Sequence, residues 1–162
     1  NSGKLINARA EGIESKPSFR VPVRKRRCLV LADSFYEWRT VDHQKIPYRI
    51  LPRDGSLLVM AGIWDLWDKE GYPVKSFSII TTTPNLELSS LHNRMPVMLQ
   101  TLEERLAWLE PMEIEEVLAF LHPPKDGAYH IYRVSDELNS PSHNTPELHK
   151  ELPENLDLFS QR

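Results

Sequence analysis

Three short segments of the sequence carry polar side chains where the surrounding strand pattern calls for apolar ones. They are Leu5–Glu11 (LINARAE), Ala32–Trp38 (ADSFYEW) and His92–Pro96 (HNRMP). Departures of this kind from local sequence rules are frequent at functional sites. The carboxylate, imidazole and amide groups within them can transfer protons or orient a reacting atom. We therefore take these segments as the source of the candidate site residues.

Glu37 and His92 are the side chains best suited to acid–base chemistry. Glu37 stands between Tyr36 and Trp38, and apolar surroundings of this kind raise the pKa of a carboxyl toward neutrality. An imidazole can exchange protons near neutral pH, which makes His92 a candidate proton carrier. The structural alternatives are a buried glutamate paired with an arginine such as Arg9, and a histidine without a catalytic role.

The elements that must position these residues indicate a mainly antiparallel sheet. Apolar or alternating runs of strand length predict strands at Cys28–Ala32, Phe35–Trp38, Pro47–Leu51, Leu57–Trp67, Val74–Thr83 and Tyr129–Val134. Asp54-Gly55 and Glu70-Gly71 lie between such runs and predict hairpin turns. Gly62, within the longest run, indicates a bulge or a close approach of another backbone. Trp64 and Trp67 in the same run are expected in the core.

Helical patterns follow in the second half of the chain. Thr101 with Glu104 three residues later predicts a capping box that opens a helix over Leu102–Leu109. Glu113–Leu121 repeats the amphipathic pattern. The proline-containing tail from Asn139 is expected to be irregular. The sequence therefore predicts an α+β fold, with a mainly antiparallel, barrel-like β core and short peripheral helices.

The composition fits one domain with an uneven charge. The chain has 162 residues, of which 40% are hydrophobic and 27% charged, as in an ordinary globular protein. Residues 1–50 hold 11 Lys and Arg against 5 Asp and Glu, whereas residues 51–162 hold 9 against 18. The basic first part favours an anionic partner, with nucleic acid the leading candidate. The alternative is a solvated charged surface.

Cys28 is the single cysteine, which excludes an internal disulfide and a cysteine-based metal cluster. It lies in an apolar run, where a thiol acts as a small hydrophobic group with a raised pKa and not as a nucleophile.

Neither a secretory signal nor an apolar run of membrane-spanning length is visible. We therefore expect a cytoplasmic protein that is not attached to a membrane. We expect no metal and no cofactor, since the sequence has no His, Asp and Glu cluster with ligand spacing.

Seven segments follow one another along the chain from Ile6 to about Leu148: INARAE, KPSFR, RRCLVLADSFYEW, AGIWDLW, IITTTPN, LHNRMP and SPSHNTPEL. In this order they resemble the SOS-response-associated peptidase (SRAP) family. The resemblance implies a compact, largely antiparallel β fold with short helices, with the SRAP-like domain over residues 1–150 and a C-terminal tail over 151–162. Asn93 stands where the family usually has Asp, which removes a possible charge partner of His92.

The resemblance implies a covalent reaction with damaged single-stranded DNA. Family members begin Met-Cys-Gly-Arg, and removal of Met exposes a cysteine whose α-amine attacks the aldehyde of a ring-opened abasic site. The Schiff base that results is closed by the thiol into a thiazolidine, a stable protein–DNA crosslink that shields the lesion. Lyase and autoproteolytic activities are also implied. The chain begins at Asn1, so we expect the N-terminal part that carries the nucleophilic cysteine to be missing from it.

The resemblance also implies roles for individual residues. Glu37 would move protons between the amine and its carbinolamine, and His92 would open the deoxyribose ring or release the crosslink. Asn7 would orient a sugar hydroxyl or the attacking amine, although a turn or cap role is its structural alternative. The DNA-binding residues would be Arg9, Thr81 and Arg94. Their guanidinium and hydroxyl groups would hold phosphates and fix position without reading sequence.

Three functions remain open on this basis. The first is a DNA-repair protein of the SOS response, a monomer that crosslinks to abasic single-stranded DNA. The second is a non-enzymatic single-stranded DNA-binding module that keeps the pocket without the reaction. A peptidase that cuts other proteins ranks last, because nothing supplies a Ser-His-Asp or Cys-His pair.

Overall fold

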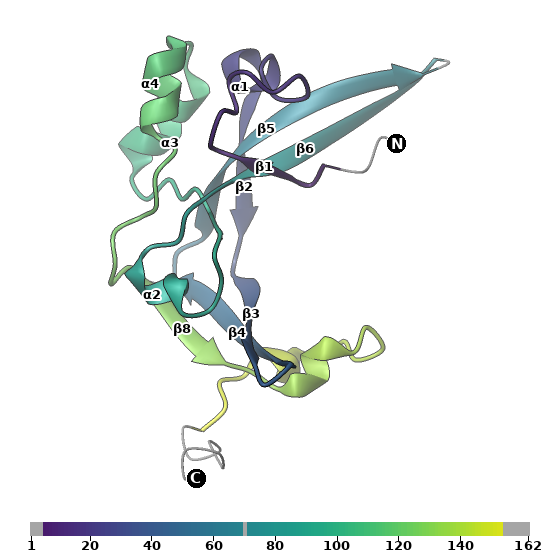
Figure 1. Ribbon diagram of the computed structural model, residues 1–162, viewed down its shortest axis with the longest axis vertical. Helices are drawn as coiled ribbons and strands as arrows, with labels where there is room; N and C mark the ends of the chain where they lie inside the picture. The colour runs from purple at the N-terminus through teal and green to yellow at the C-terminus, as the bar shows by residue number, and fades with distance from the viewer. Residues whose placement is uncertain (1–4, 70, 154–162) are drawn as a thin grey trace.

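The computed structural model describes residues 5–69 and 71–153 and folds them into two β-sheets with short helices around them (Figure 1). Sheet A has the strand order β1-β6-β5-β2, with β7 paired to β6, and sheet B has the order β3-β4-β8. Only the β1–β6 pairing is parallel among the strands of the described residues. The strands are β1 (Asn7–Arg9), β2 (Arg27–Ala32), β3 (Phe35–Val41), β4 (Gln44–Pro52), β5 (Leu58–Lys69), β6 (Tyr72–Thr82), β7 (Met95–Pro96) and β8 (Tyr129–Arg133).

The α+β fold with mainly antiparallel strands is confirmed, but the expected barrel-like core is replaced by two separate sheets. The chain leaves sheet A after β2, builds β3 and β4 in sheet B, and returns to sheet A at β5. The sheets therefore share connections but no strand-to-strand pairing, and within the described part of the chain neither of them closes on itself.

The tight turn at Asp42-His43 that joins β3 to β4 was not indicated by any sequence pattern. Both strands extend beyond the predicted ends, and Val41 pairs with Gln44 across a two-residue turn. Asp42 and His43 both have positive φ, of 47° and 67°, as a type I′ turn requires. Asp-His is not the Asn-Gly or Asp-Gly pair that usually signals this turn, so the turn could not be predicted from its residue types.

The helices are short and lie outside the sheets. The Thr101 side chain accepts from the Glu104 backbone N–H, and the Glu104 side chain accepts from the Thr101 backbone N–H. The predicted capping box at the start of α3 is therefore confirmed. In α4 the helix ends two residues before the predicted Leu121. None of the helices among residues 5–69 and 71–153 combines the length and apolar character needed to cross a membrane. The helices are α1 (Pro22–Lys25), α2 (Leu86–Ser89), α3 (Leu102–Leu109), α4 (Ile114–Ala119) and the 3-10 helices η1 (Asp136–Asn139) and η2 (Pro146–His149).

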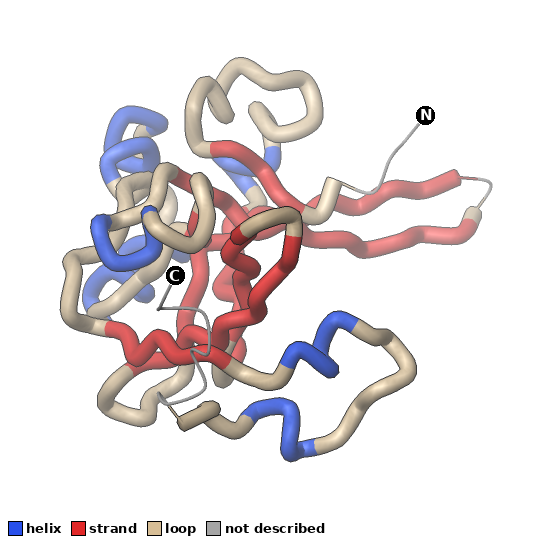
Figure 2. Tube along the Cα trace, turned by 60° about the horizontal axis from the view of Figure 1, so that its bottom comes forward, coloured by secondary structure: helices blue, strands red, loops and turns tan. Residues whose placement is uncertain are grey.

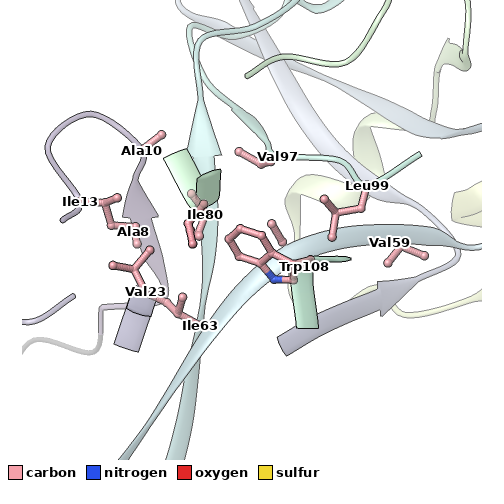
Figure 3. Packing of buried hydrophobic residues seen from close by; sticks show 12 residues of the cluster. Ala8, Ala10, Ile13, Val23, Val59, Ile63, Ile80, Val97, Leu99 and Trp108 are labelled. Atoms are coloured by element: carbon pink, nitrogen blue, oxygen red, sulfur yellow. The ribbon is translucent and has the colours of Figure 1, made fainter. Parts of the chain in front are cut away.

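Two clusters of buried apolar side chains hold the layers together. The first lies between sheet A and the helices, and Figure 3 shows Trp108 of α3 at its centre, close to Ile80 of β6. The Trp108 indole N–H donates to the Cys28 carbonyl at 3.0 Å, which ties α3 to β2. The second cluster joins sheet A to sheet B and includes Met60 of β5 and Ile50 of β4.

Trp64 and Trp67 do not belong to these clusters, so the expectation that they are core residues is wrong. They are 37% and 56% exposed. Both lie in the outer half of β5, past Ile63, the last β5 residue paired with β2. From there the β5–β6 hairpin projects from the body of the protein (Figures 1 and 2). An apolar strand pattern cannot distinguish a buried strand from one that extends past its neighbours.

Gly62 marks a close approach between β5 and β2, but the nearest atoms belong to side chains of β2 and not, as the sequence interpretation had it, to its backbone. The register runs unbroken through Gly62 on both sides, opposite Cys28 in β2 and Ile79 in β6, so there is no bulge. A Cβ atom at this position would lie 2.7 Å from Val30 Cγ2 and 2.9 Å from Cys28 Sγ. The side chains of β2 therefore occupy the space that any larger residue would need.

We predict that Gly62→Ala lowers the free energy of unfolding by about 1–3 kcal/mol, the usual cost of overpacking. Urea denaturation measures it. In the double variant Gly62→Ala/Val30→Ala the shortest contact is removed, so the loss should be smaller than the sum of the two single losses. Strict additivity would show that the Val30 methyl does not cause the strain.

Candidate functional site

Glu37 and His92 meet at the junction between sheet B and the segment that leads from α2 to β7. The His92 Nδ1 atom lies 3.6 Å from Glu37 Oε1. Strand alternation turns Glu37 to one face of β3, and its neighbours Tyr36 and Trp38 turn to the other. There Tyr36 bonds to the His149 ring and Trp38 donates to Asn139. The two residues predicted for acid–base chemistry thus lie side by side, although they are far apart in the sequence.

The environment of Glu37 favours its protonated form. Its side chain is 19% exposed, and desolvation raises the pKa of the carboxyl, opposed by the attraction of His92 and by a backbone hydrogen bond at Trp38. The direction of the shift agrees with the sequence expectation, but Tyr36 and Trp38, on which that expectation rested, lie on the opposite face of β3. The alternative of a pair with Arg9 does not occur, since the ion-pair partner of Glu37 within the described residues is His92.

The ring of His92 is oriented by the backbone two residues later. Nδ1 lies 3.0 Å from the Arg94 carbonyl oxygen and 3.3 Å from the Arg94 backbone nitrogen. The shorter contact favours a proton on Nδ1 that is donated to the carbonyl. Nε2 then remains free to accept a proton. The backbone N–H of His92 donates to Leu88 of α2 at 3.1 Å, which anchors the segment from its other side.

Arg94 is held by an ion pair that sequence analysis missed. Its guanidinium Nη1 and Nη2 atoms donate to Glu11 Oε1 and Oε2 at 2.6 and 3.0 Å. Nη2 also donates to the Thr81 carbonyl and lies 3.3 Å from the Thr81 hydroxyl. The hydrogen bonds from Arg94 lower the pKa of the Glu11 carboxyl. Two predicted DNA-binding residues, Thr81 and Arg94, are thus in contact, and Glu11 occupies the guanidinium fork.

Asn7 and Arg9 lie on β1, with their side chains exposed. Asn7 pairs with Ile79 and Arg9 with Thr81 in the parallel β1–β6 ladder, so the four side chains share one face of sheet A. Ile79 packs against the second cluster, as does Phe35 of β3. This face of sheet A therefore turns toward the face of sheet B that carries Glu37. Within the described residues, neither Asn7 nor Arg9 contacts Glu37 or His92 through a hydrogen bond or ion pair.

Other candidate features lie elsewhere or do not form a site. A cavity of about 280 Å³ lies next to α3 and the β4–β5 turn, between Arg53, Leu57, Arg105 and Tyr129, and no predicted site residue lines it. Burial raises the pKa of the Cys28 thiol, as expected for a residue of the apolar run. Among residues 5–69 and 71–153, no three His, Cys, Asp or Glu side chains gather as they would around a metal ion.

Comparison with known proteins agrees with the sequence motifs. Residues 1–141 match the family described as SOS response associated peptidase (SRAP). The abasic site processing protein YoqW of Bacillus subtilis is 43% identical over 149 residues, which are 90% of this chain and 66% of that protein. The abasic site processing protein HMCES of Gallus gallus is 35% identical over 167 residues, covering 89% of this chain and 49% of that protein.

A crystal structure of a protein from Bacteroides thetaiotaomicron superposes with a TM-score of 0.84 at 37% identity. The match covers 91% of this chain and 66% of that one. The chain thus spans slightly less than two thirds of its bacterial relatives in both comparisons.

We predict that Glu37→Gln stabilises the fold at neutral pH but not in acid. Well below pH 4.5, the ordinary pKa of the carboxyl, Glu37 is protonated whether the chain is folded or unfolded. As the pH rises, the unfolded chain releases this proton first, so the wild type loses stability until the pH passes the raised folded pKa. Glutamine cannot ionise and avoids this loss. Urea unfolding from pH 4 to pH 8 should show a growing advantage for Glu37→Gln, with the exposed Glu103→Gln as control. An advantage that does not change with pH would contradict the desolvation of Glu37.

Proposed function

The chain belongs to the SOS response associated peptidase (SRAP) family, and from this premise we propose that it processes abasic sites in single-stranded DNA. Its relatives in Bacillus subtilis and Gallus gallus carry the name abasic site processing protein. The observation that carries the proposal is the contact of Glu37 with His92, 3.6 Å apart and next to Arg94 and Thr81. Glu37 and His92 together offer proton transfer, and the exposed Arg9 on β1, whose guanidinium is unengaged among the described residues, suits a phosphate.

The chemistry that fits this pair is covalent capture of the abasic aldehyde. The α-amine of an N-terminal cysteine adds to the aldehyde carbon, and the carbinolamine that forms loses water to give a Schiff base. The cysteine thiol then adds to the same carbon and closes a thiazolidine ring, while its proton passes to the nitrogen. No atom is lost apart from the one water molecule.

Two of the proton transfers in this reaction have a suitable side chain in the protein. The free Nε2 of His92 accepts the proton that the amine loses as it adds to the aldehyde. Desolvation raises the pKa of Glu37, which suits this carboxyl to donate a proton to the hydroxyl that leaves as water. The deprotonated Glu37 is then stabilised by the imidazolium beside it. Asn7, on the facing sheet surface, orients the sugar hydroxyl or the amine.

The nucleophile itself is not among residues 1–162, where the single thiol is the partly buried Cys28. The proposal therefore concerns the protein with the Met-Cys-Gly-Arg start of the family in place. Lyase activity belongs to the same proposal, because a Schiff base at C1′ makes the neighbouring proton acidic and favours loss of the 3′ phosphate. Autoproteolysis also belongs to it and acts on the protein's own N-terminus.

We predict that the full-length protein, incubated with single-stranded DNA that contains one abasic site, gives a protein–DNA band that survives denaturing electrophoresis. Glu37→Gln and His92→Ala should slow its formation about 10²-fold or more, the usual worth of a positioned acid or base. The control substrate is a tetrahydrofuran analogue, which has no aldehyde and should give no band.

Two results would reject the crosslinking reaction. If the wild type binds the DNA but gives no band with its N-terminal cysteine present, the protein is a single-stranded DNA-binding module without the reaction. If the band forms equally fast in Glu37→Gln and His92→Ala, these two residues are not the proton carriers. Thermal unfolding of both variants checks that the fold is intact.

We predict that Arg9 contributes a phosphate contact. Its guanidinium forms no hydrogen bond or ion pair with any other part of the chain that the structure describes, so it is available to an anion. For DNA with the tetrahydrofuran analogue, Arg9→Ala should weaken binding and reduce the slope of log K against log salt by about 0.7. Fluorescence anisotropy at several salt concentrations measures both. Arg53→Ala, an exposed arginine of the β4–β5 turn, is the matched control, and an equal loss in both variants would point to diffuse charge instead.

A further inference from the structure

Glu11 has no role in the chemistry proposed above, yet it makes the best-defined ion pair of the candidate site. Both of its carboxylate oxygens accept from the two terminal nitrogens of Arg94, in a bidentate geometry with two parallel N–H···O bonds that adds both energy and geometric specificity. Glu11 itself is 56% exposed, whereas the Arg94 side chain is only 17% exposed. The pair therefore places the charge of a largely buried guanidinium against a carboxylate at the surface.

Arg94 in turn connects three segments that are far apart in the sequence. Its side chain reaches Glu11 after β1 and the Thr81 carbonyl on β6. Its own backbone carbonyl and N–H contact Nδ1 of His92. Any movement of the Arg94 main chain therefore changes the orientation of the imidazole that faces Glu37.

Without the Glu11 charge this arrangement has a strong reason to move. A largely buried guanidinium that loses its counter-ion is costly, so the side chain turns toward water or a new partner. The Nε–H of Arg94 already lacks an acceptor in the described part of the structure, so loss of the Glu11 carboxylate would leave more of the buried guanidinium without a partner. Only two peptide units separate Arg94 from His92, and a displacement of the former carries the latter with it.

We propose that Glu11 is a positioning residue of the site, acting through Arg94 to hold the imidazole of His92 in the orientation that leaves Nε2 free and Nδ1 beside Glu37. The inference rests on the proposed function for its consequence, the rate of capture. The geometry that it describes belongs to the protein alone and exists without DNA.

The experiment compares wild type, Glu11→Gln and Glu14→Gln in the full-length protein. Glu14 is a matched control, because it lies in the same turn and its carboxylate forms no ion pair or hydrogen bond within the described residues. The first measurement is the long-range ¹H–¹⁵N spectrum of the histidine rings, assigned with His92→Ala, which reports the tautomer of His92 without DNA. The second is the rate of crosslinking at saturating abasic DNA, together with the affinity for the tetrahydrofuran analogue.

The proposal expects the His92 signals of wild type and Glu14→Gln to show a single tautomer with the proton on Nδ1, and those of Glu11→Gln to show a mixture. It also expects Glu11→Gln to crosslink at least about tenfold more slowly than wild type, since small displacements of a catalytic group cost this much. The affinity of Glu11→Gln for the tetrahydrofuran DNA should stay within a factor of about two of the wild-type affinity. An affinity that stays constant while the rate falls separates positioning from DNA binding.

Two results would overturn the positioning role. If the His92 spectrum and the rate of Glu11→Gln match those of wild type, Glu11 does not act through Arg94. If Glu11→Gln binds DNA more tightly and reacts faster, Glu11 competes with a DNA phosphate for the Arg94 fork. A wild type that fails to crosslink would instead reject the proposed function, and the ring spectra would still decide whether Glu11 orients His92.

Discussion

The approach of Glu37 to His92 depends on one packing constraint, the apolar cluster shared by the two sheets. Met60 and Leu58 of β5, Ile50 of β4 and Met95 of β7 meet in that cluster. Because β3 is paired to β4, and His92 lies between α2 and β7, the same contacts bring the carboxyl of β3 against the imidazole. Desolvation of Glu37 follows from this packing, since Phe35, two residues away on the same face of β3, packs against the cluster. The acid–base property of the candidate site therefore follows from the way the sheets are joined.

The C-terminal segment supports β3 from the opposite side. Tyr36 bonds to the ring of His149, and Trp38 donates to Asn139 at 2.7 Å. Arg49 on the neighbouring β4 donates to Tyr132 at 3.1 Å. Glu37 thus projects from a strand that is held on one face by polar contacts and packed on the other against apolar side chains. A strand fixed in this way can keep a half-buried carboxyl at a constant distance from its partner.

The two arginines near the candidate site differ in their contacts: the guanidinium of Arg94 is bound within the protein, and that of Arg9 is available to a ligand. Arg94 is engaged by Glu11 and by the Thr81 carbonyl, whereas the exposed Arg9 has an unengaged guanidinium among the described residues. Both arginines carry the same guanidinium group, so the residue type alone suits each of them equally to bind a phosphate. The ion pair with Glu11 separates their roles, because a guanidinium fork that holds a carboxylate must release or share it before it can hold a phosphate.

The sequence by itself determined the properties that depend on near neighbours in the chain. The capping box of Thr101 and Glu104, the central strands and the close approach at Gly62 are all encoded within a few residues. The polar segments around Glu37 and His92 also indicated the two side chains whose nearest atoms, Oε1 and Nδ1, lie 3.6 Å apart. The family motifs point to the same segments in order, and residues 1–141 match that family.

Only the tertiary structure decided which distant groups become neighbours. The Asp42-His43 turn, the exposure of Trp64 and Trp67, and the pair of open sheets in place of a barrel depend on how far each strand finds a partner. The ion pair of Glu11 with Arg94 spans 83 residues, and no local pattern reveals it. Charges attract over a few ångströms in space regardless of their separation along the chain, so their partners are fixed only when the sheets have packed.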